Sequence, residues 1–230
     1  MLRRNEKAIA VWLLLMPLCG SLAIAPAYGS DEQSAANPPA SVAAQGDASK
    51  GIPPCSSCHG SHGQGNSAVG FPRLAGLPAP YLERQLNALA SGDRNNAMMH
   101  PVAKTLSAEQ LKTLADYYAG LPAPQASGAA PLANAASVEE LAKHGRPEQG
   151  LPGCVLCHGS GGVGIGEDFP PLAGQSAIYM ANQLRAWKQH TRPPGPMGLM
   201  SSIAGKLSES DITTLSAYFA AQPSTEEAKP

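Results

Sequence analysis

The feature that most constrains this chain is an internal repeat of about 99 residues. Three motifs occur twice, in the same order and at offsets of 98 or 99 residues: Cys-x-x-Cys-His at 55–59 and 154–158, Phe-Pro-x-Leu-Ala-Gly at 71–76 and 169–174, and Tyr-x-x-x-Gln-Leu at 81–86 and 179–184. A period this long exceeds the roughly 20–50 residues of a solenoid unit and suits a whole small domain. The sequence therefore predicts two related domains in tandem.

Both halves carry helical patterns, and neither shows a convincing alternating strand pattern. The segments 107–110 and 137–140 match the capping box that opens a helix. Apolar residues spaced by three and four follow Ser107, and the same spacing follows Ser208. Further helices are expected over 81–90 and 179–189. The sequence thus predicts three or four helices per domain, joined by glycine-rich loops.

Composition and motif positions divide the chain into six segments. The stretch at 122–136 is rich in Pro, Ala, Gly and Ser, which is typical of a linker. The expected segments are a signal peptide at 1–29, a disordered N-terminus at 30–41, a first domain at 42–121, the linker at 122–136, a second domain at 137–222 and a disordered tail at 223–230.

The N-terminus resembles a secretory signal. Arg3, Arg4 and Lys7 precede an apolar stretch over 8–24, and the small residues at 25–27 offer a cleavage site. The alternative is an uncleaved membrane anchor, which the shortness of the stretch and a proline within it disfavour. We therefore expect the mature protein in the periplasm.

Charge and aromatic content limit the functional classes. The net charge is −1 and no Lys/Arg-rich run occurs, so nothing indicates a nucleic-acid partner. Aromatic residues make up only 5% of the chain. A core built from side chains alone would therefore be thin, and a buried prosthetic group would help to fill it.

Cys-x-x-Cys-His is the attachment motif of c-type haem. The thiols of Cys55 and Cys58, like those of Cys154 and Cys157, could add to the two vinyl groups of a porphyrin. The histidine after each pair, His59 or His158, would then give the iron its proximal nitrogen. A thioredoxin-like redox site, a zinc site and two disulfides are the alternatives, and each leaves part of this repeated pattern unexplained.

A six-coordinate haem needs a second axial ligand, and a methionine occupies the same position in both halves. Met99 lies eight residues before Ser107, and Met200 lies eight residues before Ser208. This shared register favours Met99 and Met200 over their neighbours Met98 and Met197. The remaining histidines have no counterpart in the other half, so we expect them in loops or on the surface: His62, His100, His144 and His190.

A histidine that binds a metal usually donates its other ring N–H to an acceptor. Pro72 and Pro170 stand at the repeated Phe-Pro step, and a proline carbonyl accepts while its nitrogen cannot donate. We expect these two carbonyls to orient the histidines. The alternative is that the prolines only shape the loop.

These motifs together resemble those of the di-haem c4-type cytochromes of the class I cytochrome c superfamily, over roughly residues 45–222. The resemblance implies an all-α fold of two tandem class I cytochrome c-type domains, each with three to four helices around one covalent haem. It implies two covalently bound haem c groups, the axial pairs His59/Met99 and His158/Met200, and domains that pack with their haem propionate edges facing each other.

The resemblance also implies an electron carrier rather than an enzyme. Filled axial positions would restrict the chemistry to outer-sphere transfer of single electrons between a respiratory donor and a terminal oxidase. The donor would be a quinol:cytochrome c reductase or a small copper or haem protein, and the chain could associate loosely with the inner membrane. The main alternative is the electron-transfer subunit of a periplasmic dehydrogenase for sulfide, thiosulfate or an alcohol. A di-haem peroxidase is a third reading, which the paired methionines disfavour.

Overall fold

The computed structural model describes residues 39–124 and 134–224, which belong to one compact unit. The expected signal peptide lies outside the described residues, as do most of the expected N-terminal segment, linker and C-terminal tail. The described residues are helical and contain no strand longer than an isolated bridge pair. None of their helices is long and apolar enough to cross a membrane.

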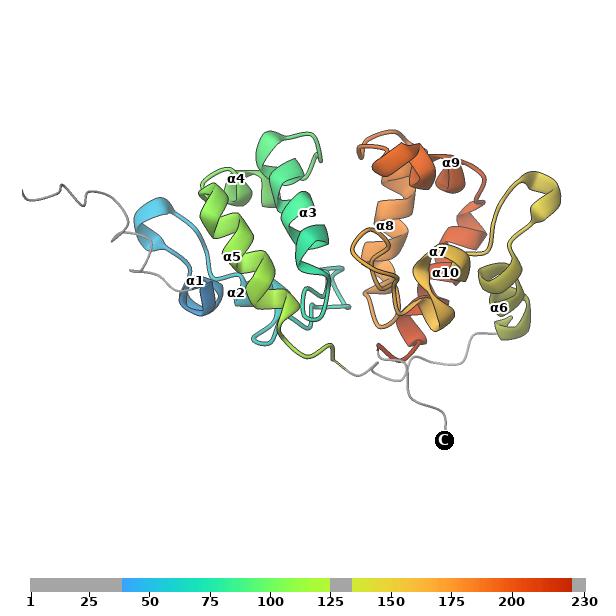
Figure 1. Ribbon diagram of the computed structural model, residues 1–230, viewed down its shortest axis with the longest axis horizontal. Coiled ribbons are helices and arrows are strands. Elements are labelled where there is room, and N and C mark those ends of the chain that lie inside the picture. The colour runs from blue at the N-terminus through green and yellow to red at the C-terminus, as the bar shows by residue number, and fades with distance from the viewer. Residues whose placement is uncertain (1–38, 125–133, 225–230) are drawn as a thin grey trace, which may run out of the picture. The chain divides into compact units, whose positions relative to one another are not determined.

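The two repeats fold into the same order of helices (Figure 1). The first repeat contains α1 Pro39–Gln45, the 3-10 turn η1 Ala48–Lys50, α2 Ser56–His59, α3 Ala79–Ser91, α4 Met99–Ala103 and α5 Ala108–Ala119. The second contains α6 Ala135–His144, η2 Pro147–Gln149, α7 Val155–His158, η3 Ser160–Gly162, α8 Ala177–Lys188, η4 Pro196–Gly198, α9 Leu199–Gly205 and α10 Glu209–Ala221. Each described repeat thus has five α-helices where the sequence predicts three or four, because the Cys-x-x-Cys-His segments form single helical turns of their own.

The last helix of each repeat begins where the sequence predicts. The Ser107 hydroxyl accepts from the backbone N–H of Gln110, and the Gln110 side chain accepts from the Ser107 N–H. Ser208 and Asp211 form the same reciprocal pair at α10. Each box satisfies two backbone donors that a helix start would otherwise leave without partners.

Two helices begin at positions that the sequence does not predict. Helix α6 starts at Ala135, so Ser137 lies inside it, and its hydroxyl donates to the Asn134 carbonyl instead of capping the helix. Helix α1 starts at Pro39, so residues 39–41 are helical although the sequence predicts them to be disordered. In both cases burial of an apolar face, such as Val42 and Ala43 in α1, outweighs the weak local signal.

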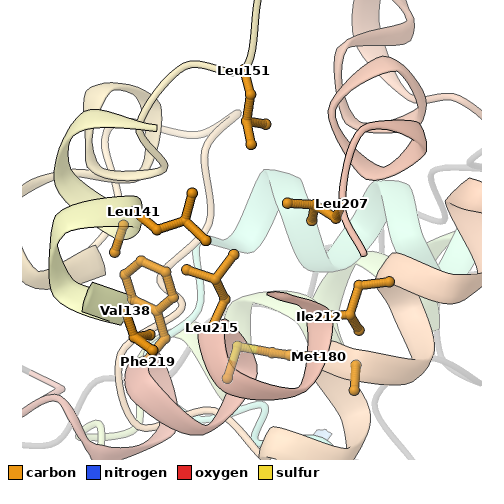
Figure 2. Packing of buried hydrophobic residues seen from close by; sticks show 10 residues of the cluster. Val138, Leu141, Leu151, Met180, Leu207, Ile212, Leu215 and Phe219 are labelled. Carbon is orange, nitrogen blue, oxygen red and sulfur yellow. The ribbon is translucent and has the colours of Figure 1, made fainter. Parts of the chain in front are cut away.

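Each repeat buries its own apolar cluster. In the second repeat, residues of α6, α8 and α10 converge on one cluster (Figure 2), which consists of Val138, Leu141, Ala142, Leu151, Met180, Ala181, Leu207, Ile212, Leu215 and Phe219. In the first repeat, α1 and α3 pack on α5, around Val42, Ala43, Leu77, Leu82, Leu114, Ala115 and Tyr118. Aliphatic residues dominate both clusters, as the low aromatic content of the chain predicts.

Candidate haem-binding sites

The Cys-x-x-Cys-His segments form single helical turns that point their chemical groups to one side. Cys154 is the N-cap of α7 and has helical backbone angles, and Cys157 lies within the helix. Residues three apart are neighbours on a helix, so the two cysteines lie on one face. The turn ends at a glycine, directly after the buried His158. Helix α2 presents Cys55, Cys58 and His59 in the same way.

A glycine in each following loop allows this turn to lie close to the Phe-Pro step. Gly65 has a φ of +82°, and a Cβ there would come within 2.6 Å of the Arg73 nitrogen. Gly164, its counterpart, has a φ of +91°, and a Cβ there would come within 2.8 Å of the Pro171 Cδ. Only glycine tolerates both the left-handed backbone and this approach. The close packing of the loop brings each histidine within reach of its proline.

The histidine–proline contact expected from the sequence is present in both repeats. His59 Nδ1 lies 2.9 Å from the Pro72 carbonyl oxygen, and His158 Nδ1 lies 2.8 Å from that of Pro170. A carbonyl can only accept, so each Nδ1 carries the proton and each Nε2 keeps a lone pair free to bind a metal. Burial lowers the pKa of both imidazoles, which favours the neutral form that a metal requires.

A cavity of about 540 Å³ collects the candidate residues of the second repeat. Cys154, Cys157, His158, Pro170 and Met200 all line it, together with apolar side chains of α8 and α10. Its volume lies within the roughly 300–1,000 Å³ of typical cofactor pockets. The cavity thus brings together two thiols, an imidazole with a free nitrogen and a thioether. These are the groups that attach a c-type haem and bind its iron.

Met99 and Met200 are less exposed than the neighbouring methionines, although Met197 also lines the 540 Å³ cavity. Met99 opens α4 and Met200 lies in the first turn of α9, and both are half-buried. Their rivals Met98 and Met197 are 62% and 86% exposed. The backbone N–H of Met99 donates to Asn96 Oδ1 across 2.8 Å, which fixes the start of α4.

The other four histidines lie elsewhere. His62, His144 and His190 are exposed, as expected for surface residues. His100 differs from that expectation because it lies inside α4, half-buried, with its Nδ1 2.8 Å from the Leu89 carbonyl.

The alternative uses of the cysteines find less support. Burial raises the pKa of Cys154 to about 11, whereas thioredoxin-like cysteines need a lowered thiol pKa. No three His, Cys, Asp or Glu side chains cluster for a metal ion anywhere in residues 39–124 and 134–224, so a tetrahedral zinc site lacks its ligands there. The four thiols are free.

A buried polar network joins the repeats, and its arginines were not singled out by the sequence reasoning. Arg94 donates to Gln85 of its own repeat and to Tyr179 and Gln183 of the other. Arg192 donates to Gln183 of its own repeat and to Gln85 of the other. The signal that could have revealed the network is that these arginines, like the Tyr and Gln residues, recur at an offset of 98.

The network is strongly positive. Neither Arg94 nor Arg192 belongs to an ion pair among the described residues, although both are buried and line the 540 Å³ cavity. Burial opposes ionisation of Tyr179 and is the largest single influence on its pKa, yet the charges of Arg94 and Arg192 together with the hydrogen bonds to the phenol outweigh it and lower that pKa. Two buried cations beside a cofactor-sized cavity create a site suited to carboxylates.

Comparison with known proteins places these features in context. The family model for cytochrome c matches residues 53–121. The chain is 48% identical over 174 residues to a thiosulfate dehydrogenase electron acceptor of Thiomonas intermedia (strain K12), a match that covers 74% of this chain and 78% of that relative. It is 37% identical over 178 residues to cytochrome c4 of Pseudomonas aeruginosa, covering 76% of this chain and 86% of that one.

A solved structure extends the likeness to three dimensions. The chain superposes on thiosulfate dehydrogenase (TsdBA) from Marichromatium purpuratum, in its as-isolated form, with a TM-score of 0.76 and 41% sequence identity. The match covers 83% of this chain and 41% of that longer chain.

Proposed function

The chain belongs to the di-haem c4-type cytochromes of the class I cytochrome c superfamily, and from that premise we propose which residues hold its haems and which partners it serves. Its fold is all-α, with two cytochrome c domains. It acts as an electron-transfer protein, a carrier rather than a catalytic enzyme.

We assign one haem to each repeat. Cys55 and Cys58 would form the thioether bonds of the first haem, with His59 and Met99 as its axial ligands. Cys154 and Cys157 would attach the second, with His158 and Met200 on its iron. The observation that carries the assignment is the 540 Å³ cavity, which all four residues of the second set line.

The remaining residues of each site have supporting roles. The Pro72 and Pro170 carbonyls accept from Nδ1 of the histidines, which would leave Nε2 available to bind iron. Arg94 and Arg192, which line the cavity, would supply buried positive charge for the carboxylates of a haem. A bound haem would supply an iron able to take up and release one electron. If side chains held both axial positions, substrate would have no access to the metal and the transfer would be outer-sphere.

For the physiological role, we propose a periplasmic shuttle of single electrons from a respiratory donor to a terminal oxidase. A quinol:cytochrome c reductase or a small copper or haem protein would serve as the donor. The likeness to cytochrome c4 over most of the chain supports this role. The apolar segment at 8–24, preceded by basic residues, supports export.

A second candidate role has a specific observation in its favour. The relative from Thiomonas intermedia is a thiosulfate dehydrogenase electron acceptor, and a similar segment forms part of the thiosulfate dehydrogenase chain from Marichromatium purpuratum. We therefore propose the catalytic subunit of a thiosulfate dehydrogenase as the alternative electron donor. The two roles share one haem apparatus and differ only in the protein that delivers the electron.

The haem assignment is tested on protein made in a host that matures c-type cytochromes. The denatured chain should keep its colour and show the added mass of two porphyrins. Replacement of Cys154 and Cys157 by Ala should remove one porphyrin and leave the other, and replacement of Cys55 and Cys58 should do the same for the first. A colourless denatured chain would refute the assignment.

The choice of donor is tested by kinetics. The oxidised holoprotein is mixed with a thiosulfate dehydrogenase catalytic subunit and thiosulfate, or with a quinol:cytochrome c reductase and quinol, and haem reduction is followed by absorbance. Reduction within milliseconds to seconds by the first pair, and much slower reduction by the second, would establish the dehydrogenase role. The reverse order would establish the respiratory role.

A further inference from the structure

The two repeats depart from their common pattern at two positions that touch each other. Arg73 stands where the second repeat has Pro171, and Gln175 stands where the first has Leu77. The Arg73 N–H donates to Gln175 Oε1 across 2.8 Å, and Gln175 Nε2 donates back to the Arg73 carbonyl across 3.0 Å. The glutamine of one repeat thus holds the arginine backbone of the other by two buried hydrogen bonds.

The Arg73 guanidinium binds equivalent groups of both repeats. Its Nη1 donates to the Ala75 carbonyl across 2.8 Å, and its Nη2 donates to the Ala173 carbonyl across 3.0 Å. Ala75 and Ala173 occupy the same place in the repeated motif, each three residues after the proline whose carbonyl accepts from a haem-site histidine. One cation therefore lies at the junction of the repeats, in a similar relation to both sites.

This cation is buried without a counter-charge. Arg73 is 1% exposed, and none of the ion pairs among the described residues includes it. Its Nε has no hydrogen-bond partner in that part of the chain. Desolvation lowers the pKa of the guanidinium to about 10, so it remains protonated at neutral pH. Burial of a charge without a counter-charge costs free energy, so we expect Arg73 to have a function at this position.

We infer that Arg73 sets the reduction potentials of both haems, because its fixed positive charge at the junction of the domains favours the reduced form of each iron. Reduction adds one electron from the donor and lowers the charge on the iron by one unit, so a nearby cation stabilises ferrous over ferric iron. The inference rests on the proposed function, since it requires a haem in each repeat.

The test compares charged and uncharged replacements in the holoprotein by anaerobic spectroelectrochemical titration. Arg73→Met removes the charge and keeps an unbranched apolar stem, and Arg73→Gln is a second uncharged variant whose amide can donate a hydrogen bond. Both should lower the two midpoint potentials together. At a fixed ambient potential the ferrous-to-ferric ratio should fall about fourfold to twentyfold, as for unit charges roughly 10–20 Å apart at an effective dielectric constant of about 20.

Three further variants separate the effect of the Arg73 charge on the potentials from an effect of altered structure. Arg73→Lys keeps the cation and should keep both potentials near those of the original protein. Gln175→Leu, which introduces the residue of the first repeat, should lower the unfolding temperature and leave the potentials nearly unchanged. Arg185→Met is the matched control, because it removes a partly exposed arginine that pairs with Glu209 at 2.8 Å and does not line the haem-site cavity.

Three results would overturn the inference. They are unchanged potentials in Arg73→Met or Arg73→Gln, an equal fall in Arg73→Lys, or an equal fall in Arg185→Met. Porphyrin mass and haem absorbance of the original protein are measured first. Absence of haem there would refute the proposed function itself, whereas two haems with potentials insensitive to the Arg73 charge would refute this inference alone.

Discussion

Arg94 Nη2 of the first repeat donates to Gln183 Oε1 of the second across 2.8 Å, and the equivalent pair, Arg192 Nη2 and Gln85 Oε1, repeats the contact in the opposite direction across 2.9 Å. Reciprocal contacts of this kind are typical of an isologous interface, in which both partners use the same surface patch. Here the two patches belong to one chain. The repeat therefore extends to the interface as well as to the individual domains.

Replacement of Arg94 should weaken this interface. Arg94→Leu removes three part-buried hydrogen bonds. Arg192 still donates to both glutamines, so the Tyr179 hydroxyl is the acceptor that loses its arginine donor, and such a loss costs about 1–3 kcal/mol. We expect the calorimetric unfolding temperature of the holoprotein to fall by several degrees. Lys112→Ala, which breaks an exposed ion pair with Asp116, is the control and should cost less than about 0.5 kcal/mol. Equal effects of both changes would argue against a stabilising network.

Removal of the proposed methionine ligands should affect one haem at a time. Met200→Ala should abolish the iron–thioether absorption band of the second haem and lower its potential, because a thioether ligand favours ferrous iron. Met197→Ala is the control, since that side chain is 86% exposed, and it should leave the spectrum unchanged. Met99→Ala and Met98→Ala form the same pair for the first haem. Loss of the band in a control variant would transfer the ligand role to that residue.

Alanine at Gly164 should destabilise the second repeat. Its Cβ would lie 2.8 Å from the Pro171 Cδ and 2.9 Å from the Pro171 nitrogen, at a φ of +91°. We expect Gly164→Ala to lower the free energy of unfolding in guanidinium by more than about 2 kcal/mol, from strain and steric overlap together. Gly161→Ala is the matched control. Its φ is +61° but nothing lies within 4 Å of the added Cβ, so only about 1 kcal/mol is expected.

Acid should remove the stabilisation that Asp211 provides. The side chain of Arg146 holds both carboxylate oxygens, and together with the Ser208 contacts it lowers the pKa of Asp211 well below its usual range. A carboxylate with a lowered folded-state pKa stabilises the protein above its unfolded pKa, about 3.9, and this contribution is lost as the pH falls through the folded-state value.

The measurement for this prediction is unfolding by denaturant at several pH values. Asp211→Asn should cost about 2 kcal/mol between pH 5 and 7, as expected for hydrogen bonds to a charged group, and the difference should shrink progressively as the pH falls below about 3.9. Asp116→Asn, at an exposed carboxylate, should show little difference at any pH. A difference for Asp211→Asn that persists undiminished in acid would contradict the electrostatic cause.

The sequence predicts most of the features that lie within a single repeat. The doubled motifs reveal the two domains, and the chemistry of proline and histidine is enough to anticipate the contact between His158 and Pro170. A local signal also predicts the capping box at Ser107, whereas the box expected at Ser137 does not form and the one at Ser208 is not predicted. Local signals fail at Pro39 and Ala135, where helix formation depends on apolar faces that become buried only in the folded domain.

Contacts between the repeats could not be predicted in the same way. Arg94 and Arg192 reach across to glutamines about 90 to 107 positions away in the chain, and no local pattern specifies which faces of two domains meet. The contact between Arg73 and Gln175 could not be predicted for a different reason. A search for matches between repeats passes over the positions where the repeats differ, and these two residues are paired through that difference.

The polar character of the interface network has a consequence for how the halves stay together. Guanidinium, amide and phenol groups bond well to water, so contacts among them give little net affinity between separate molecules. Both repeats belong to one chain, so the effective concentration of one repeat around the other is on the order of millimolar, as for short tethers. The covalent connection thus allows the junction to remain polar, where two independent subunits would need a larger apolar surface to associate.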